Sequence, residues 1–352
     1  MKALIGMSGG VDSSVAAYLM QQDGYDCVGG TMLLYTGQDG GKCATLESVQ
    51  DAKSVAERMG IPFHVFDLSN EFNQQVMENF VECYMCGLTP NPCIECNRKL
   101  KFGAFLEQAQ KIGCQYIVTG HYAQIEKLEN GRYCLKKAVD EGKDQTYFLY
   151  TMNQEQLSHT KFPLGGLTKA QAREIAQEQG FINAKKKDSQ DICFVPDGDY
   201  LPFLERYTGK RSVPGAFLDQ NGNIVGQHKG AAGYTLGQRK GLGLAMGAPV
   251  YVTGKDMAAN TVTVGPNEAL FRRELIARDL NWMTIETLTA PMQCKAKARS
   301  RMTEQPATIY PLEDGKVKVV FEEPQRAITP GQAVVFYDGD LVIGGGTIQE
   351  AL

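Results

Sequence analysis

The sequence predicts an α/β fold class, in which an N-terminal doubly wound parallel sheet is followed by a small β-rich central domain and a C-terminal β-barrel. Three observations lead to this prediction. Apolar runs in the first part of the chain lack the alternation of half-exposed strands, so they fit strands buried on both faces of a parallel sheet. Segments of helical periodicity separate these runs. Beyond Gly180 the chain changes to short strand-like runs between turns rich in Gly and Pro.

The elements of the first domain alternate along the chain. Buried strands are expected at "KALIG", "CVGGTMLLY", "FHVFDL" and "CQYIVTGH", and helices at 12–22, 46–59, 71–85 and 99–112. Ligands of doubly wound domains bind beyond the carboxyl ends of the strands. The ligand site is therefore expected in the loops 7–13, 32–45, 86–98 and 119–123.

Two β-rich domains are expected after this sheet. The runs "VYVTG" and "NTVTVG" predict strands of a small central domain, and "KVKVVFEEP", "AVVFYDGD" and "LVIGGGTI" predict the regular short strands of a barrel. A chain of 352 residues is long enough for two or three hydrophobic cores. The predicted domain boundaries are 1–200, 205–270 and 275–352.

Composition excludes some classes of function. Lys and Arg number 36 against 40 Asp and Glu, for a net charge of −4, so the chain is not a globally basic nucleic-acid binder and any RNA contact needs local patches. No stretch approaches the length of a membrane span and no export signal is recognisable, so we expect a cytoplasmic protein without a membrane partner. Ten cysteines in such a protein are expected to be reduced thiols, available for chemistry or metal binding.

The string "ALIGMSGGVDSSVAAYLM" joins a buried strand to a helix through a glycine-rich turn. Backbone N–H groups of such a turn converge on an anion, and the helix N-terminus adds partial positive charge, so the turn is predicted to bind phosphate. Asp12 and Ser13 could cap the helix or help to hold Mg²⁺. Neither a Walker A lysine nor a G-x-G-x-x-G pattern is present. The loop resembles that of the ATP-pyrophosphatases, which cleave ATP to AMP and pyrophosphate and adenylate a carbonyl oxygen.

The stretch "NPCIECNRKLKF" contains two thiols, Cys93 and Cys96, three residues apart. With Cys83 and Cys86 they have the spacing of a zinc or iron–sulfur site, but six intervening residues are few for two tetrahedral knuckles. A reactive thiol at Cys96 is the stronger interpretation. Cations follow it and a helix is expected to begin after it, and both lower the pKa of a thiol. The cations are Arg98, Lys99 and Lys101.

A further thiol, Cys193, lies in the stretch "AKKKDSQDICFV". An exposed loop thiol close to positive charge can be charged with sulfur. The alternative is a small buried hydrophobe beside Ile192 and Phe194.

Seven motifs occur in the order found in the bacterial tRNA-uridine 2-sulfurtransferases, the MnmA/TrmU family, which the chain therefore resembles. They are "GMSGGVDSS", "TPNPCIECNRKLKF", "TGHYA", "KDQTYFLY", "KKKDSQDICF", "YTLGQRKGLG" and "ITPGQAVVFYDGDLVIGGG". The resemblance implies an ATP-pyrophosphatase domain of the adenine nucleotide alpha hydrolase type, a central domain and a tRNA-contacting barrel. It also implies ATP- and Mg²⁺-dependent 2-thiolation of the wobble uridine of tRNAs for Lys, Glu and Gln.

The same resemblance assigns residues to roles. Cys96 would be the nucleophile and Cys193 the carrier of a persulfide. The ATP and Mg²⁺ site would contain Gly6, Met7, Ser8, Gly9, Gly10, Val11, Asp12, Ser13, Met32 and Gly120. The target base and the tRNA would be met by Asn91, Pro92, Cys93, His121, Lys143, Asp144, Gln145, Arg299, Ser300 and Gln332. Two positions depart from the family: many members have Asp in place of Cys93, and Ser300 is often aromatic.

The chemistry expected from these groups has two steps. ATP adenylates the C2 oxygen of uracil, which is a poor leaving group, and sulfur then displaces AMP. Cys96 would attack a persulfide on Cys193 and leave a Cys96–Cys193 disulfide for reduction. The persulfide needs a donor partner, a cysteine desulfurase or a relay protein. An alternative is an iron–sulfur cluster on Cys93, Cys96 and Cys193.

Local basic patches are expected to bind the tRNA backbone. In "CKAKARSRM" the strand period predicts four cations on one face, Lys295, Lys297, Arg299 and Arg301. Further candidates are Lys185 to Lys187 and the pair Arg239 and Lys240. Two rival functions stay open at this point: an enzyme of the same loop class that adenylates a small molecule, such as an amide ligase, and a non-catalytic zinc-bearing RNA-binding module.

Overall fold

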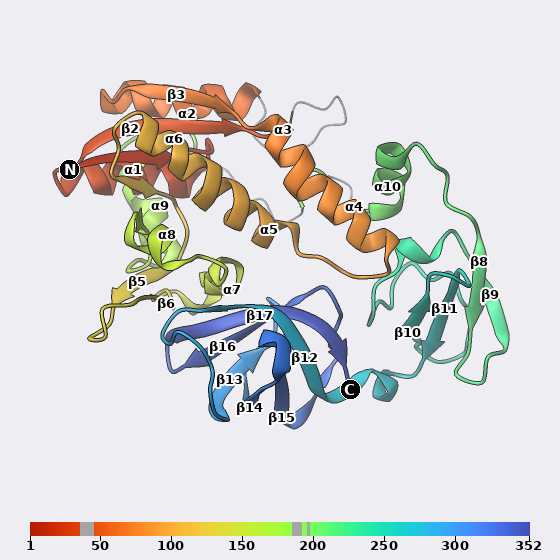
Figure 1. Cartoon of the computed structure of the whole chain (residues 1–352). Coiled ribbons are helices and arrows are strands. Elements are labelled where there is room, and N and C mark those ends of the chain that lie inside the picture. The colour runs from red at the N-terminus through yellow and green to blue at the C-terminus, as the bar shows by residue number, and fades with distance from the viewer. Residues whose placement is uncertain (36–45, 185–191, 196–197) are drawn as a thin grey trace.

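The first domain is built on a parallel sheet with the strand order β3-β2-β1-β4-β7 (Figure 1). The computed structural model describes residues 1–35, 46–184, 192–195 and 198–352. All neighbouring strands of this sheet run parallel, which confirms the predicted doubly wound domain. The strand order reverses at β1, whose neighbour on one side is β2 and on the other β4. The strands are β1 (Lys2–Gly6), β2 (Asp26–Leu33), β3 (Phe63–Asp67), β4 (Tyr116–Val118) and β7 (Thr160–Lys161).

Helices cover both faces of this sheet, and its inner strands β1 and β2 are mostly buried. The edge strand β3 is largely exposed, so the prediction that it is buried on both faces is wrong. Ile5 of β1 packs into a core with α1, α2 and α9, whereas its neighbour Leu4 packs into a second core with α6 and β4. None of the helices within the described residues combines the length and the apolarity that a membrane span requires. The helices that pack on the sheet are α1 (Val11–Gln22), α2 (Leu46–Met59), α6 (Phe105–Lys111) and α9 (Lys169–Glu178).

The helix predicted at 99–112 begins earlier than predicted, at Pro92. Pro92 occupies the first helical position, and the Asn91 side chain caps the helix by accepting a hydrogen bond from the Cys93 N–H at 3.2 Å. Cys96 therefore lies inside a continuous helix, so the prediction that it precedes a helix N-terminus is wrong. The helix consists of α5 (Pro92–Glu95), a π-helical segment (Cys96–Ala104) and α6.

A second helix, predicted at 71–85, packs beside this one. It also contains a π-helical segment, and it consists of α3 (Ser69–Phe72), the π-helical Asn73–Met77 and α4 (Glu78–Met85). Its aromatic side chains share a hydrophobic core with residues from the π-helical segment Cys96–Ala104 and from α10 (Tyr200–Thr208). This core also contains Phe194, which is buried beside Phe80 at a ring distance of 5.2 Å.

The central domain is a sheet of mixed direction with the order β10-β11-β8-β9. Its middle pair, β11 and β8, is parallel and its outer pairs are antiparallel. The strands are β8 (Gly215–Leu218), β9 (Ile224–His228), β10 (Tyr251–Asp256) and β11 (Thr261–Gly265). Short 3₁₀ turns occur here and elsewhere at Glu141–Lys143, Ala231–Gly233, Asn267–Leu270 and Glu313–Gly315.

The C-terminal strands form a closed barrel, as predicted. The order is β12-β15-β14-β13-β16-β17, and the barrel closes because β12 pairs with both β15 and β17. A hairpin of the first domain extends the same sheet, since β6 pairs with β17. The barrel strands are β12 (Phe271–Trp282), β13 (Met292–Lys297), β14 (Gln305–Pro311), β15 (Val317–Arg326), β16 (Ala333–Asp338) and β17 (Leu341–Ala351), and the hairpin strands are β5 (Gln124–Lys127) and β6 (Tyr133–Lys136).

The barrel packs against the first domain through a shared core (Figure 1). The Tyr147 hydroxyl donates to the Ala333 carbonyl at 2.9 Å, and the Asn281 side chain donates to the Tyr150 carbonyl at 2.6 Å. Two short helices of the first domain lie at this junction, α7 (Thr146–Leu149) and α8 (Gln154–Ser158). The barrel is thus fixed to the sheet domain by buried contacts.

Close packing at this junction predicts that Gly345 tolerates no side chain. A Cβ on Gly345 would lie 2.6 Å from the Tyr150 ring and 2.7 Å from the Val334 carbonyl oxygen, so Gly345→Ala should lower the stability by about 1–3 kcal/mol. The matched control is Gly166→Ala, because a Cβ at Gly166 meets nothing within 4 Å and should change the stability by less than about 0.5 kcal/mol. Thermal unfolding followed by circular dichroism measures both, and equal midpoints would contradict the packing described here.

Candidate active site

The predicted phosphate loop, residues 7–13, follows β1 and ends in the first turn of α1. Gly9 has a φ of +71°, and a Cβ there would lie 2.5 Å from the Ser48 carbonyl oxygen, so only glycine fits. The N-cap of α1 is Gly10, and no side chain caps the helix. Of the two roles considered for Asp12 and Ser13, capping of the helix is not observed, and holding Mg²⁺ stays a prediction. The N-cap residue therefore places no side chain over the first turn of α1, an arrangement typical of helix N-termini that bind anions.

The serines of the loop bond to each other and to the backbone instead. Ser13 Oγ accepts a hydrogen bond from the Ser8 N–H at 3.2 Å and donates to the Gly10 carbonyl at 3.0 Å. Ser14 Oγ donates to the same carbonyl at 3.1 Å. These bonds stabilise the turn of the loop.

Gly120 brings the loop after β4 against the phosphate loop. A Cβ on Gly120 would lie 2.7 Å from the backbone carbon of Asp12 and 2.8 Å from the Ser13 nitrogen. Gly6 also approaches β4, since its Cβ position lies 3.4 Å from the Val118 carbonyl oxygen. The structure thus brings Gly6 to Ser13 together with Gly120 at the point where the strand order reverses, which is where this fold class binds ligands.

Asp12 is held by two residues that the sequence did not indicate. Lys169 Nζ lies 2.8 Å from both carboxylate oxygens of Asp12, and the Tyr122 hydroxyl donates to one of them at 2.9 Å. Lys169 is separated from Asp12 by 157 residues and stands at the start of α9. The pattern Thr168-x-x-Gln171 is a capping box that could have located this helix start, although not its neighbour.

Asn183 is a third residue that the sequence did not indicate. Its side-chain amide is buried and donates to the Gly9 carbonyl at 3.1 Å and to Ser14 Oγ at 2.9 Å. The Oδ1 atom of this amide has no hydrogen-bond partner among the described residues. The residue therefore ties the phosphate loop to the chain segment that leads towards Cys193.

Cys96 is buried, and its thiol is not activated in this structure. Burial raises the pKa of Cys96 to about 12, although Lys101 acts in the opposite direction. The prediction of a lowered pKa at Cys96 is therefore wrong, because desolvation outweighs the one nearby cation. Lys101 follows Cys96 by five residues in the π-helical segment.

The thiols of Cys93, Cys96 and Cys193 form one cluster. Cys96 and Cys193 pack in the same hydrophobic core. Desolvation raises the pKa of both Cys93 and Cys96, the charge of Cys193 raises both further, and Lys101 opposes these shifts. Cys93 is exposed in the first turn of α5, and Cys193 is half-buried beside the buried Phe194. The cluster joins the two predicted catalytic cysteines.

A metal site is not found among these thiols. Within the described residues, no group of three or more His, Cys, Asp or Glu side chains has an arrangement that could hold a metal ion. Cys83 and Cys86 lie at the end of α4, where Cys83 Sγ contacts Asn79 Oδ1 at 3.9 Å. The structure therefore supports neither the four-cysteine zinc site nor the iron–sulfur ligand set.

His121 connects the thiol cluster to the phosphate loop. It follows Gly120 directly, its Nδ1 lies 2.7 Å from Thr119 Oγ1, and its ring packs between Phe102 and Phe162 at 5.8 Å from each. Burial, together with the charge of Lys101, holds the pKa of His121 well below 6.5. The imidazole is therefore neutral, and Lys101 lies near both His121 and the thiols.

Two residues that were predicted to bind tRNA, Asp144 and Gln145, make hydrogen bonds within the protein. Asp144 accepts hydrogen bonds from Thr146 Oγ1 at 2.6 Å and from the Ala138 N–H at 3.1 Å, and burial raises its pKa. The Gln145 side chain accepts from the Tyr122 N–H at 2.9 Å. These two residues hold the loop after His121 in place, and their neighbour Lys143 is half-buried.

The predicted row of cations is interrupted after Lys297, where β13 ends. Lys295 is exposed, and Lys297 Nζ lies 6.0 Å from the centre of the Tyr147 ring. Arg299 turns inward and donates to the Leu236 carbonyl and to Thr329 Oγ1. The prediction that these cations continue along one strand face is therefore wrong beyond Lys297. Ser300 follows in the turn after the strand.

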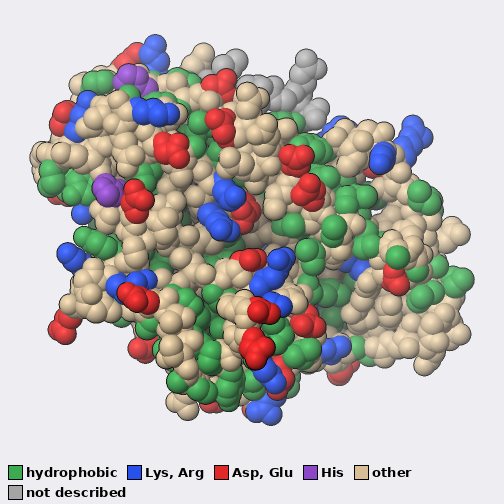
Figure 2. Space-filling model, viewed as in Figure 1, with side chains coloured by type: hydrophobic (Ala, Val, Ile, Leu, Met, Phe, Trp, Pro, Cys, Tyr) green, Lys and Arg blue, Asp and Glu red, His purple; other side chains and the backbone are tan. Residues whose placement is uncertain are grey.

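The other basic candidates are dispersed. Arg239 and Lys240 are exposed in the central domain, and Lys185 to Lys187 lie outside the described residues. On the face shown in Figure 2, basic and acidic side chains are intermixed. No single basic surface is visible on that face, in agreement with the net charge of −4.

Gln332 joins the barrel to the loop that carries the thiols. Its side chain donates to the Thr89 carbonyl at 2.9 Å, and the Thr89 N–H donates to the Pro330 carbonyl at 3.0 Å. A Cβ on Gly331 would lie 2.9 Å from the Thr89 nitrogen. These contacts with the barrel therefore fix the position of the chain just before Asn91 and the helix that contains Cys93.

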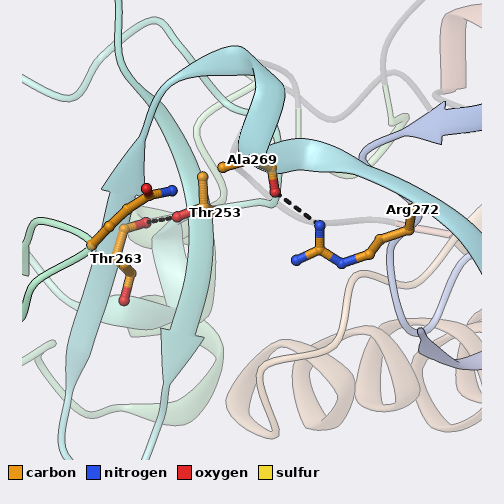
Figure 3. A pocket seen from close by; sticks show the side chains of 5 residues that line it. Thr253, Thr263, Ala269 and Arg272 are labelled. Atoms are coloured by element: carbon orange, nitrogen blue, oxygen red, sulfur yellow. Dashed lines mark hydrogen bonds between the residues drawn. The ribbon is translucent and has the colours of Figure 1, made fainter.

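Two surface pockets lie away from these residues. One, of about 440 Å³, is formed where the central domain meets the barrel (Figure 3). There Arg272 Nη1 donates to the Ala269 carbonyl at 3.1 Å, so its guanidinium is held by backbone. The other is on the barrel and is bordered by Cys294, whose pKa burial raises to about 12. Neither pocket contains a predicted ATP or thiol residue.

The neutral state of His121 predicts a loss of stability in acid. Its pKa in the folded protein is below 6.5, so as the pH falls through 6.5 the unfolded chain takes up a proton that the folded protein does not. The difference in thermal midpoint between the wild-type protein and His121→Gln should therefore shrink between pH 7.5 and pH 5.5. Midpoints that fall in parallel would show that folded and unfolded states take up the His121 proton over the same pH range, so that folding does not lower its pKa.

Comparison with known proteins covers all three domains. Residues 1–197 match the family described as "tRNA methyl transferase HUP domain", residues 202–266 the "tRNA methyl transferase PRC-barrel domain", and residues 272–348 the "Aminomethyltransferase beta-barrel domain". Among solved structures, a 4-thiouridine synthetase–RNA complex with bound ATP is 18% identical, covers 58% of this chain and 50% of its own, and has a TM-score of 0.37. A similarity of that size says nothing about function.

The full-length relatives are more informative. The chain is 50% identical over 356 residues to "tRNA-specific 2-thiouridylase MnmA" of Clostridioides difficile, covering 100% of this chain and 99% of the relative. It is 51% identical over 355 residues to the protein of the same name from Acetivibrio thermocellus, covering 99% of each. The resemblance drawn from the seven motifs is thereby confirmed. The chain belongs to the family of tRNA-specific 2-thiouridylases.

Proposed function

We propose that this protein converts the wobble uridine of tRNAs for Lys, Glu and Gln to 2-thiouridine, with ATP as the activating substrate and a cysteine persulfide as the sulfur carrier. One observation carries the proposal. The loop after β4 links the phosphate loop to the helix that contains Cys96: Gly120 lies against Asp12, and the next residue, His121, packs on Phe102 of that helix at a ring distance of 5.8 Å. A uridine placed between them would reach both groups.

The first step is adenylation. The C2 oxygen of uracil attacks the α-phosphorus of ATP, the bond from that phosphorus to the bridging oxygen breaks, and pyrophosphate leaves. The uncapped N–H groups of α1 and the close backbone approach of Gly9 suit the phosphates. Asp12 and the phosphates would hold Mg²⁺, which usually binds through one or two carboxylates plus substrate oxygens and neutralises the charge of the leaving group.

The second step is sulfur transfer. A persulfide on Cys193, loaded by a cysteine desulfurase or relay protein, would be attacked by the Cys96 thiolate at the Cys193 sulfur. The Cys96–Cys193 bond forms, the persulfide bond breaks, and hydrosulfide leaves to attack C2 and expel AMP. An external reductant then restores both thiols. Burial keeps Cys96 protonated in the structure, so its proton must be removed when the substrate is bound, and Lys101 is the cation placed to stabilise the thiolate.

We further propose the domain limits 1–200, 205–270 and 275–352 and a tRNA surface that includes the barrel. In support, the strands of the central sheet and of the barrel fall inside the second and third ranges, apart from the first residues of β12. The exposed Lys295 and the neighbouring Lys297 belong to the barrel, and Gln332 connects it to the thiol loop. A cytoplasmic location is part of this proposal, because tRNA is the substrate.

The cysteine variants test the sulfur route. Cys96→Ser and Cys193→Ser should each lower 2-thiouridine formation by at least about a hundredfold, because no other thiol takes over either role. Both should keep tRNA-dependent release of pyrophosphate, since adenylation needs the loop and not the thiols. Mass spectrometry of the tRNA nucleosides and a pyrophosphate assay measure the two steps separately.

Cys93→Ser is the matched control for these variants. In iron-free protein supplied with a persulfide donor it should retain activity, because Cys93 is exposed and is not required for the exchange between the other two thiols. Loss of activity in all three variants, in step with loss of bound iron from anaerobically purified protein, would establish the iron–sulfur alternative instead.

The exposed Lys295 and the half-buried Lys297 of the barrel predict a change in salt dependence. Replacing Lys295 and Lys297 by Ala should weaken tRNA binding and lower the slope of log K against log salt concentration by about 0.7 to 0.9 for each phosphate that is no longer neutralised. The control is Lys53→Ala, which removes an exposed lysine paired with Glu57 on α2. A slope equal to that of the control would mean that this strand does not face the tRNA.

A further inference from the structure

A buried ammonium group lies beside the phosphate loop. The side chain of Lys169 is 9% exposed, and its Nζ contacts both oxygens of Asp12 at 2.8 Å. Its ammonium also lies 5.8 Å from the centre of the Tyr122 ring, whose hydroxyl donates to the same carboxylate. The positive charge is therefore held where the loop meets α1.

Lys169 is anchored at its backbone and reaches the loop with a flexible side chain. It is the first residue of α9, its N–H donates to Asp140 Oδ2 at 2.9 Å, and a capping box formed by Thr168 and Gln171 defines the helix start. Helices α1 and α9 pack together in one core. The four-carbon stem lets the ammonium shift from one anion to a neighbouring one while the helix stays in place.

Stability alone does not explain this ion pair. Removing two charges from water costs about as much as their attraction returns, and apolar replacements of a buried pair are often neutral or stabilising. The loop, by contrast, lacks a cation of its own: between β1 and α1 it contains no lysine or arginine. Pyrophosphate leaves with several negative charges, for which backbone N–H groups offer only partial positive charge.

We propose that Lys169 is the phosphate-binding cation of this loop, contributed by a distant helix in place of a lysine within the loop. In the nucleotide-free protein its ammonium neutralises Asp12. When nucleotide is bound, the ammonium contacts the oxygens of the leaving pyrophosphate. The inference rests on the proposed function in one respect, that ATP is the ligand of the loop.

Asp12 and the pyrophosphate compete for the same ammonium under this proposal. Without a divalent cation, the carboxylate both repels pyrophosphate and retains Lys169. Asp12→Asn should therefore strengthen pyrophosphate binding, because it removes the repulsion and releases the ammonium. The gain in pyrophosphate affinity should disappear when Lys169 is replaced as well. If the ion pair were purely structural, the gain would not depend on Lys169.

The test is calorimetric titration of the full chain with pyrophosphate and with AMP, in buffer with a chelator and no Mg²⁺. Lys169→Met should lower the affinity for pyrophosphate by at least about tenfold, the effect of removing one charge-assisted hydrogen bond, and change the AMP affinity by less than about twofold. Lys169→Arg should recover part of that affinity. The matched control is Lys161→Met, which removes a lysine that lies over the Tyr116 ring at 5.1 Å in the same domain.

Each outcome has a defined meaning. Tighter pyrophosphate binding by Asp12→Asn that disappears in Asp12→Asn/Lys169→Met supports the proposal. Pyrophosphate affinities of Lys169→Met and Lys161→Met that both equal the wild-type value overturn it, and so does a wild-type protein that binds AMP but no pyrophosphate. A wild-type protein that binds neither AMP nor pyrophosphate in this buffer, and no ATP when Mg²⁺ is added, would refute the proposed function itself. Thermal midpoints of all variants show whether each of them is folded.

Discussion

The contact between Gly120 and the first turn of α1 is the constraint on which the rest of the site depends. Only a residue without a Cβ fits, since an added Cβ would lie 2.7 Å from the backbone of Asp12. This contact joins the loops after β1 and β4, the neighbouring strands at which the sheet order reverses. It also places His121, and through Lys101 the thiol helix, beside the phosphate loop. Adenylation and sulfur transfer can share one uridine because of this approach.

The barrel has a structural part in that site besides its proposed contact with tRNA. The bonds from Gln332 and Pro330 to Thr89 fix the chain just before the Asn91 cap. Arg299, expected on an RNA-facing surface, instead bonds the Leu236 carbonyl and so connects the barrel to the central domain. The barrel thus helps to position the helix that contains Cys93 and Cys96.

The thiol cluster shows how burial can outweigh local charge. Three cations follow Cys96 in the sequence, yet only Lys101 opposes the desolvation that raises the pKa of its thiol to about 12. A protonated, buried thiol is protected from oxidation between turnovers. Because the helix begins at Pro92, it is the exposed Cys93, and not Cys96, that lies at the helix N-terminus. Under the proposed function, the proton of Cys96 would have to be removed when the substrate is bound.

The sequence by itself determined the parallel sheet, the phosphate loop, the barrel and the family. Each depends on patterns contained in short segments: apolar strands, a glycine turn before a helix, regular short strands, or motifs in a fixed order. Only the tertiary structure decided which side chains complete the loop, since Lys169 and Asn183 lie more than a hundred residues from it and no local pattern links them to Asp12 or Gly9. It also decided the inward turn of Arg299 and the pKa of Cys96. These properties depend on desolvation and on contacts between distant elements, which arise only when the chain is packed.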